Sequence, residues 1–241
     1  MRRAICALIA LAGALALSGG AVRAADAVTA AIVFAVDVSG SVNAERYELQ
    51  RAGIAEIFES EGVEHVIGDG LAVSVMQWSD GHDVVIPWTI LRTPDDAHAL
   101  GQRMRTTPRS PGISTELSLA LFAAADLLAA CPCDAKKYII DVSGDGPNNG
   151  PVSTYLARDQ VIARGIRING LPIVTPQEPE LAQWYRDNVI GGYGAFVVIA
   201  HGYEDFARAM RRKFLTEVAG PPNVLRERTS VAAVLPNPSP H

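Results

Sequence analysis

A short apolar segment followed by a polar turn constrains this chain most strongly. Residues 30–36, Ala-Ala-Ile-Val-Phe-Ala-Val, are continuously apolar, as expected for a strand buried on both faces of a parallel sheet. Residues 43–58 then place apolar side chains among charged ones, which predicts a helix with one buried face. The turn between them, residues 37–41, therefore lies at the carboxyl edge of the sheet, where ligand sites of open α/β sheets gather.

Strand-like and helix-like segments alternate along the rest of the chain. Further strands are predicted at residues 71–78, 84–88, 137–142, 166–173 and 195–200, and further helices at 95–105, 115–130, 152–164, 178–190 and 203–218. Residues 79–83 indicate a hairpin, and Thr93 is the expected cap of the next helix. The pattern predicts an α/β fold with a doubly wound, mostly parallel central sheet, one antiparallel edge strand and helices on both faces.

Both ends of the chain are predicted to lie outside this domain, which would cover residues 25–219. Residues 1–24 have the layout of a secretory signal cleaved after Ala24, with Ala27 as the next choice. An uncleaved anchor is the alternative, but the apolar segment is shorter than the about 20 residues of a membrane-spanning helix. Residues 220–241 turn to Pro, Asn, Ser and Thr and predict a flexible tail. We therefore expect an exported protein, periplasmic or secreted, without membrane attachment after cleavage.

The charge balance argues against nucleic acid as a partner. The chain has a formal net charge of −5, and loss of residues 1–24 with their three arginines would take it to −8. Such a surface repels phosphate backbones, whose binding needs clustered Lys and Arg. The one basic cluster has helical spacing and is predicted to be a solvent-exposed helix face; it consists of Arg208, Arg211, Arg212 and Lys213.

Two cysteines remain after the predicted cleavage, Cys131 and Cys133, on either side of Pro132. An oxidising compartment favours their pairing, whereas the small ring that such a bridge closes opposes it, and the sequence leaves both states open. Two thiols alone do not make a structural zinc site, which normally takes four protein ligands.

Three polar segments are predicted to meet at the carboxyl edge. The first is Asp37-Val38-Ser39-Gly40-Ser41, and a second buried strand runs into a similar turn that brings Asp145. The loop at residues 110–115 supplies one more hydroxyl before a helix. A set of hydroxyls and two carboxylates suits Mg²⁺, Mn²⁺ or Ca²⁺ rather than zinc or copper, which prefer His and Cys.

These segments resemble the metal-ion-dependent adhesion site (MIDAS) of the von Willebrand factor A-type (vWA) domain, over about residues 28–219. Asp37-x-Ser39-x-Ser41 matches the first motif of that family, and Asp145-Gly146 matches its Asp-Gly motif. Residues 115–121 look like the family's Thr-x-Leu-x-x-Ala-Leu helix start. Residues 141–149, 186–192 and 195–198 resemble a bacterial exported vWA-like subfamily with no assigned function.

The resemblance implies a bound metal ion, Mg²⁺ or alternatively Mn²⁺ or Ca²⁺, whose expected ligands are Asp37, Ser39, Ser41, Thr115 and Asp145. The hydroxyls would bind directly, the carboxylates directly or through water, and one position would stay open. Because the family's Gly-Gly-Thr is replaced by residues 112–115, Gly-Ile-Ser-Thr, Ser114 is the alternative to Thr115. In the family, an Asp or Glu of a protein partner takes the open position. The implied function is metal-dependent protein binding in adhesion or assembly.

Other interpretations remain beside this one. Asp-x-Ser-x-Ser alone also fits helix capping. A metal-dependent hydrolase is a rival function, but the chain has no Gly-x-Ser-x-Gly and no His that spacing pairs with a Ser or Cys, so we do not predict an enzyme. A metal-free structural scaffold is the third function. Two further groups of residues are predicted to have structural roles. Asp80, His82 and Asp83 would form a polar hairpin tip, and Asp141 and Ser143 would support their own turn.

Overall fold

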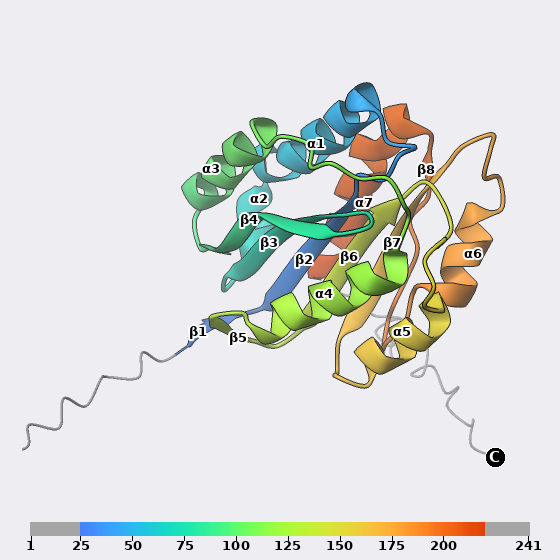
Figure 1. The fold of residues 1–241 in the computed structure, drawn as a ribbon. Helices are drawn as coiled ribbons and strands as arrows, with labels where there is room; N and C mark the ends of the chain where they lie inside the picture. Colours follow the sequence, from blue (N-terminus) through green and yellow to red (C-terminus); the bar gives the residue numbers. More distant parts are fainter. Residues whose placement is uncertain (1–24, 220–241) are drawn as a thin grey trace, which may run out of the picture.

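The apolar run of the first motif forms the central strand of a six-stranded sheet (Figure 1). The computed structural model describes residues 25–219, so the predicted signal at 1–24 and the predicted tail at 220–241 lie outside it. The strands are β1 (Asp26–Val28), β2 (Ala30–Asp37), β3 (Leu71–Trp78), β4 (His82–Leu91), β5 (Cys133–Ala135), β6 (Tyr138–Gly144), β7 (Arg167–Val174) and β8 (Ala200–His201). The α-helices are α1 (Ala44–Glu59), α2 (Val63–Ile67), α3 (Pro94–Arg105), α4 (Leu117–Ala129), α5 (Thr154–Ile162), α6 (Leu181–Asn188) and α7 (Phe206–Ala219).

The sheet has the strand order β4-β3-β2-β6-β7-β8, and only the β3–β4 pair in it is antiparallel. The predicted mostly parallel sheet with one antiparallel edge strand is therefore confirmed. The predicted strand at 195–200 is wrong in length, because Val197 meets β7 only through an isolated bridge to Gly170. A small parallel sheet of β1 and β5, at the end of β2 away from the motif, was not predicted.

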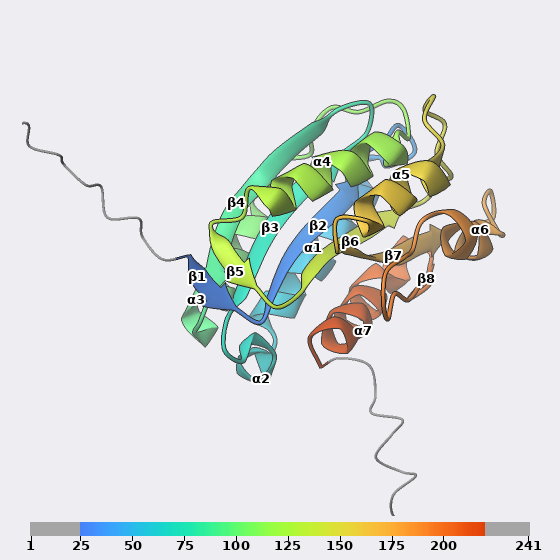
Figure 2. The same cartoon turned by 90° about the horizontal axis from the view of Figure 1, so that it is seen from below.

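Helices cover both faces of the central sheet (Figure 2). Side chains of α1, α2, α3 and α7 pack on one face, and those of α4, α5 and α6 pack on the other. Alternate residues of β2 point into the two cores, with Phe34 in the first and Val33 in the second. All eight residues of β2 are buried, which explains why the seven that precede Asp37 are apolar without interruption. No helix within residues 25–219 is long and apolar enough to cross a membrane.

Local sequence signals account for the N-termini of two helices but not of a third. Thr93 caps α3, as the Thr-Pro sequence predicts, and Asp96 completes a capping box that was not predicted. Asn43 caps α1, its side chain accepting from the backbone N–H of Arg46 at 2.9 Å. By contrast α4 begins at Leu117, two residues later than predicted, because the Thr115 carbonyl accepts from the backbone N–H of Asn149 at 2.9 Å instead of from a helical N–H.

Cys131 and Cys133 form a disulfide. It links the residues that follow α4 to the first residue of β5, so the bridge lies beside the small β1–β5 sheet. The alternative that the sequence left open, two free thiols, is not the state of this structure.

Gly53 allows α1 to pack closely against the start of α7. A Cβ at this position would lie 2.8 Å from Phe206 Cδ1 and 2.9 Å from Ala207 Cα. Alanine is the better helix former by about 0.8–1 kcal/mol, but overpacking a core typically costs about 1–3 kcal/mol. We expect Gly53→Ala to lower the free energy of unfolding by about 1–2 kcal/mol in urea denaturation. Gly81→Ala, with open space around its Cβ, is the control, and a stabilised Gly53→Ala variant would contradict the close approach.

Lys213 is fully buried, so the prediction that the whole basic cluster faces solvent is wrong. Its neighbours Arg211 and Arg212 are exposed, but Lys213 lies on the other side of α7. Its Nζ contacts Asp141 Oδ1 on β6 and lies 2.6 Å from Glu217 Oε1. Asp141, which we expected to support its own turn, instead joins the sheet to α7.

The cluster of Asp141, Lys213 and Glu217 places two carboxyl groups beside one ammonium group. All three side chains are almost completely excluded from solvent. Burial and the neighbouring Glu217 raise the pKa of Asp141 to about 8, although Lys213 lowers it. Asn169 of β7 extends the cluster by donating from Nδ2 to Glu217 Oε1 at 2.9 Å. Charged and polar groups of β6, β7 and α7 are thus joined inside the core.

Candidate functional site

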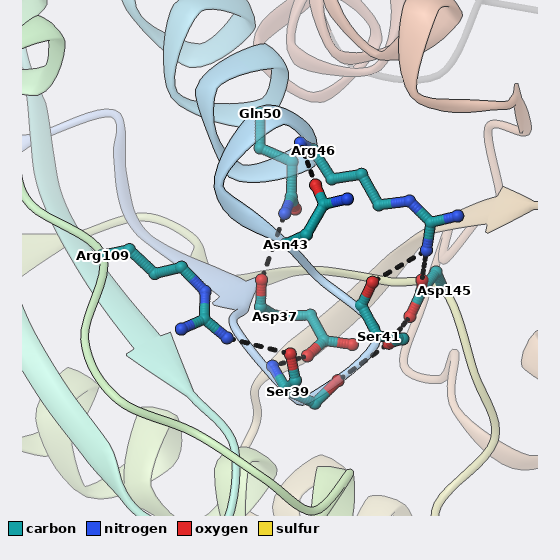
Figure 3. A network of polar contacts seen from close by, with 8 residues as sticks. All are labelled: Asp37, Ser39, Ser41, Asn43, Arg46, Gln50, Arg109 and Asp145. Atoms are coloured by element: carbon teal, nitrogen blue, oxygen red, sulfur yellow. Dashed lines mark hydrogen bonds and ion pairs between the residues drawn. The ribbon is translucent and has the colours of Figure 1, made fainter.

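The first motif forms a tight turn between β2 and α1 (Figure 3). Asp37 ends β2 and is fully buried, and its Oδ1 accepts from the backbone N–H of Ser39 at 2.7 Å. The Oγ atoms of Ser39 and Ser41 lie 3.2 Å apart. Asp37 Oδ2 is buried without a hydrogen-bond partner among residues 25–219. The turn therefore gathers two hydroxyls and an uncompensated carboxylate oxygen.

Asp145 reaches the same place from the turn after β6. Its Oδ1 accepts from Ser41 Oγ at 2.5 Å, and the residue is 5% exposed. The register of β2 and β6, with Val36 opposite Ser143, places the ends of both strands side by side. Parallel neighbours in a sheet end at the same edge, so the prediction that the two turns meet is confirmed.

Thr115 joins these residues from the loop before α4. Its backbone N–H donates to Asn149 Oδ1 and its carbonyl accepts from the Asn149 N–H, both at 2.9 Å. Together with Ser41 and Asp145, Thr115 lines a hollow of about 500 Å³. Ser114 does not line this hollow, and its carbonyl accepts from Ser79 Oγ at 2.6 Å. The hollow therefore brings Thr115 rather than Ser114 to Ser41 and Asp145, whereas Asp37 and Ser39 do not line it.

The electrostatics of the turn favour a cation. Burial is the main cause that raises the pKa of Asp37 from 3.8 to about 7; hydrogen bonds from Ser39 oppose the rise, and the Asp145 charge adds to it. Two carboxylates in a buried turn are stabilised by positive charge placed between them. Within the described part of the chain, no three His, Cys, Asp or Glu side chains gather as a metal site. The donors are hydroxyls and two carboxylates, a set that fits a hard ion such as Mg²⁺.

Two arginines that sequence reasoning missed hold the motif turn from opposite sides (Figure 3). Arg46 Nη1 donates to the Ser41 carbonyl at 2.8 Å and lies 3.3 Å from Asp145 Oδ2. Arg109 Nη2 donates to the carbonyls of Val38 and Ser39 at 2.6 and 3.1 Å. Neither residue belongs to a motif, and only the tertiary fold brings Arg109 to the turn.

Asp80, at the predicted hairpin tip, shapes the loop that carries Thr115. Its Oδ1 accepts from the Ile113 N–H at 2.8 Å and from Ser79 Oγ at 2.9 Å. These bonds lower the pKa of Asp80 to about 2. Gly112 allows the loop to pass close by, because a Cβ there would lie 2.5 Å from the Val38 carbonyl oxygen. The hairpin tip therefore supports the site by holding the loop that carries Thr115.

With this geometry in place, comparison with known families identifies the chain. Residues 27–222 match the family described as "Protein of unknown function (DUF1194)". The chain belongs to this family. No curated protein matches the sequence of this DUF1194 member.

Solved structures similar to this DUF1194 member show the vWA fold that the resemblance predicted. Proximal thread matrix protein 1 (PTMP1) from the mussel byssus, with a zinc-occupied MIDAS motif, is 19% identical; the match covers 80% of this chain and 48% of that one, with a TM-score of 0.60. A von Willebrand factor type A protein from Catenulispora acidiphila is 17% identical over 79% of this chain and 43% of that one, with a TM-score of 0.55. The vWF domain of the type V pili tip protein Mfa5 from Porphyromonas gingivalis is 9% identical over 79% and 96%, with a TM-score of 0.57. This chain thus spans about half the length of the mussel protein.

Proposed function

We propose that residues 25–219 form a protein-binding module for adhesion or assembly that depends on a divalent metal and captures an Asp or Glu carboxylate of its partner. The metal would be Mg²⁺, or alternatively Mn²⁺ or Ca²⁺, and its ligands would be Asp37, Ser39, Ser41, Thr115 and Asp145. When bound, the ion supplies positive charge and an open position for the incoming carboxylate. The observation that carries the proposal is the buried Asp37 carboxylate, whose Oδ2 lacks a partner among residues 25–219, beside two serine hydroxyls.

The surrounding residues of the chain hold these oxygen atoms in place. Gln50 Nε2 donates to the Asp37 carbonyl at 3.1 Å and fixes the end of β2. Arg109 holds the following carbonyls, and Asn149 fixes the backbone of Thr115 on both sides. These contacts keep the donors at the carboxyl edge before any ion or partner arrives, which lowers the entropy cost of binding.

The similar solved structures support this role. PTMP1 is a matrix protein whose MIDAS holds zinc, and Mfa5 is a pilus tip protein. By analogy with them, we propose that this chain has a non-catalytic binding role and lies outside the cytoplasm, in the periplasm or secreted. The location also depends on the signal predicted at residues 1–24, and the absence of a nucleic-acid partner depends on the acidic charge balance.

The metal proposal is tested by isothermal titration of the purified, metal-stripped chain with Mg²⁺, Mn²⁺ and Ca²⁺. We expect saturable binding of one ion per chain, abolished by Asp145→Ala because this substitution removes a ligand and its charge. Asp83→Ala, at an exposed position of β4, is the matched control and should bind as the unaltered chain does. No saturable binding of any of the three ions would refute the metal site. Turnover of ester or phosphoester probes that Asp145→Ala abolishes would instead favour the hydrolase.

A further inference from the structure

We propose that Arg46 is a second carboxylate-binding group of this site, which holds the partner's acidic group together with the metal and weakens binding of the metal alone. The inference rests on the proposed function and names a recognition residue outside the motif. It also predicts effects of opposite sign for the two binding events, so its failure is distinguishable from failure of the metal site.

Arg46 is held in one orientation beside the motif. It lies in the first turn of α1, where Nη1 donates to the Ser41 carbonyl and pairs with Asp145 Oδ2. The guanidinium carbon lies 5.0 Å from the centre of the Tyr203 ring, a cation–π contact that fixes the plane of the group. The side chain nevertheless stays 36% exposed. A long, flexible side chain is thereby ordered before a ligand arrives.

The guanidinium keeps donors free on its open side. Among the residues that the structure describes, its hydrogen bonds all come from Nη1, which leaves the Nη2 and Nε protons to a ligand. Arg46 lines the hollow that contains Ser41, Thr115 and Asp145, and also a neighbouring hollow of about 350 Å³ beside Tyr203. A carboxylate seated at the motif therefore lies next to a planar fork of donors, the geometry that arginine offers to carboxylates.

The charge of Arg46 acts in opposite directions on the two ligands. It pairs with Asp145, one of the proposed metal ligands, so it would repel the ion and compete for that ligand. It attracts an incoming carboxylate through both charge and hydrogen bonds. Metal binding without a partner is therefore weaker, and binding of the carboxylate to the loaded site is stronger, than in a chain without this charge.

Arg109 provides the contrasting case. Its Nη2 donates to two backbone carbonyls of the motif turn, its Nε is buried, and it lines neither hollow. Its role in the structure is to support the turn. Arg109→Gln should consequently weaken both metal and carboxylate binding. This variant is therefore the control for loss of structural support alone.

The test measures two affinities in the unaltered chain and in Arg46→Gln, Arg46→Lys and Arg109→Gln. Mg²⁺ alone is titrated calorimetrically, and sodium acetate is then titrated into ¹⁵N-labelled, Mg²⁺-loaded protein while the backbone amide of Gly40 is followed by NMR. We expect Arg46→Gln to bind Mg²⁺ about three- to tenfold more tightly and acetate about tenfold more weakly. Arg46→Lys keeps the charge but not the fork, so Mg²⁺ affinity should stay unchanged and acetate affinity should be intermediate.

Three results would overturn the inference. Unchanged acetate affinity in Arg46→Gln means that the guanidinium does not touch the carboxylate. A parallel loss of both affinities, as expected for Arg109→Gln, means that Arg46 only supports the turn. If the unaltered chain binds Mg²⁺ but not acetate, the proposed capture of a carboxylate is refuted. If it does not bind Mg²⁺, the proposed metal site is refuted first.

Discussion

Replacing Lys213 by methionine is expected to remove about 3–5 kcal/mol from the free energy of unfolding at pH 8. The substitution keeps an unbranched side chain of similar length but leaves Asp141 and Glu217 buried without their cation. An uncompensated charge in the core costs more than the ion pair contributed, because water cannot reach it. Urea denaturation monitored by circular dichroism measures the loss. Arg212→Met on the exposed side of α7 should change stability by no more than about 0.5 kcal/mol.

The pH dependence separates charge from packing in this variant. The folded-state pKa of Asp141 is raised from 3.8 to about 8, so its contribution to stability is largest below pH 4 and is lost as the pH rises towards 8. Loss of Lys213 raises that pKa further, since Lys213 is one of the groups that lower it. The deficit of Lys213→Met should therefore stay nearly constant from pH 5 to about pH 7 and grow from pH 8 upward, where only the unaltered chain ionises Asp141. A deficit that stays equal up to about pH 9 would point to lost packing alone.

Asp37→Asn is expected to abolish metal binding and, at pH 8 with chelator present, to stabilise the fold by about 1–2 kcal/mol. The stabilisation follows from the raised pKa of Asp37, because above pH 7 the unaltered chain buries an ionised group whose Oδ2 has no partner among residues 25–219. The asparagine keeps an oxygen that can accept from Ser39. At pH 5, where Asp37 is protonated in the folded chain, the gain should disappear.

Added metal should reverse the order of the two proteins. An ion that binds only the folded state stabilises it by about 2.7 kcal/mol at a concentration 100 times its dissociation constant. The unaltered chain should therefore gain stability from Mg²⁺ while Asp37→Asn does not, which differential scanning calorimetry with chelator or Mg²⁺ would show. Asp83→Asn supplies an exposed acid-to-amide control. Equal gains from Mg²⁺ in all three proteins would mean that the ion binds away from the motif.

The fold was predictable where one local signal decided an element. The continuous apolar run of β2 and the Thr93 cap of α3 depend on neighbouring residues only, and both were predicted correctly. The small β1–β5 sheet was missed because each strand has three residues and its pairing joins distant segments. The burial of Lys213 could not be predicted from the sequence either. Helical spacing shows which residues share a face, but not that Asp141 lies opposite that face.

The candidate site divides in the same way. Asp37, Ser39 and Ser41 form one local turn, and strand order brings Asp145 beside it, so motif and topology were enough to predict their meeting. The residues that hold the turn act through long-range contacts, as Arg109 does with the carbonyls of Val38 and Ser39. Such support carries no motif, because any chain segment that passes nearby can provide it.

The position of the small β1–β5 sheet bears on how a tethered domain would be oriented. β1 lies at the amino end of β2, and α7 starts near Arg46 and runs back along the sheet to pack beside α2 (Figure 2). Residues 25 and 219 therefore both lie at the pole opposite Asp37. A tether attached at either of them would leave the proposed binding face pointing outward. Several copies fixed to one support would face the same way, and weak single contacts would add up to avidity for a repetitive partner.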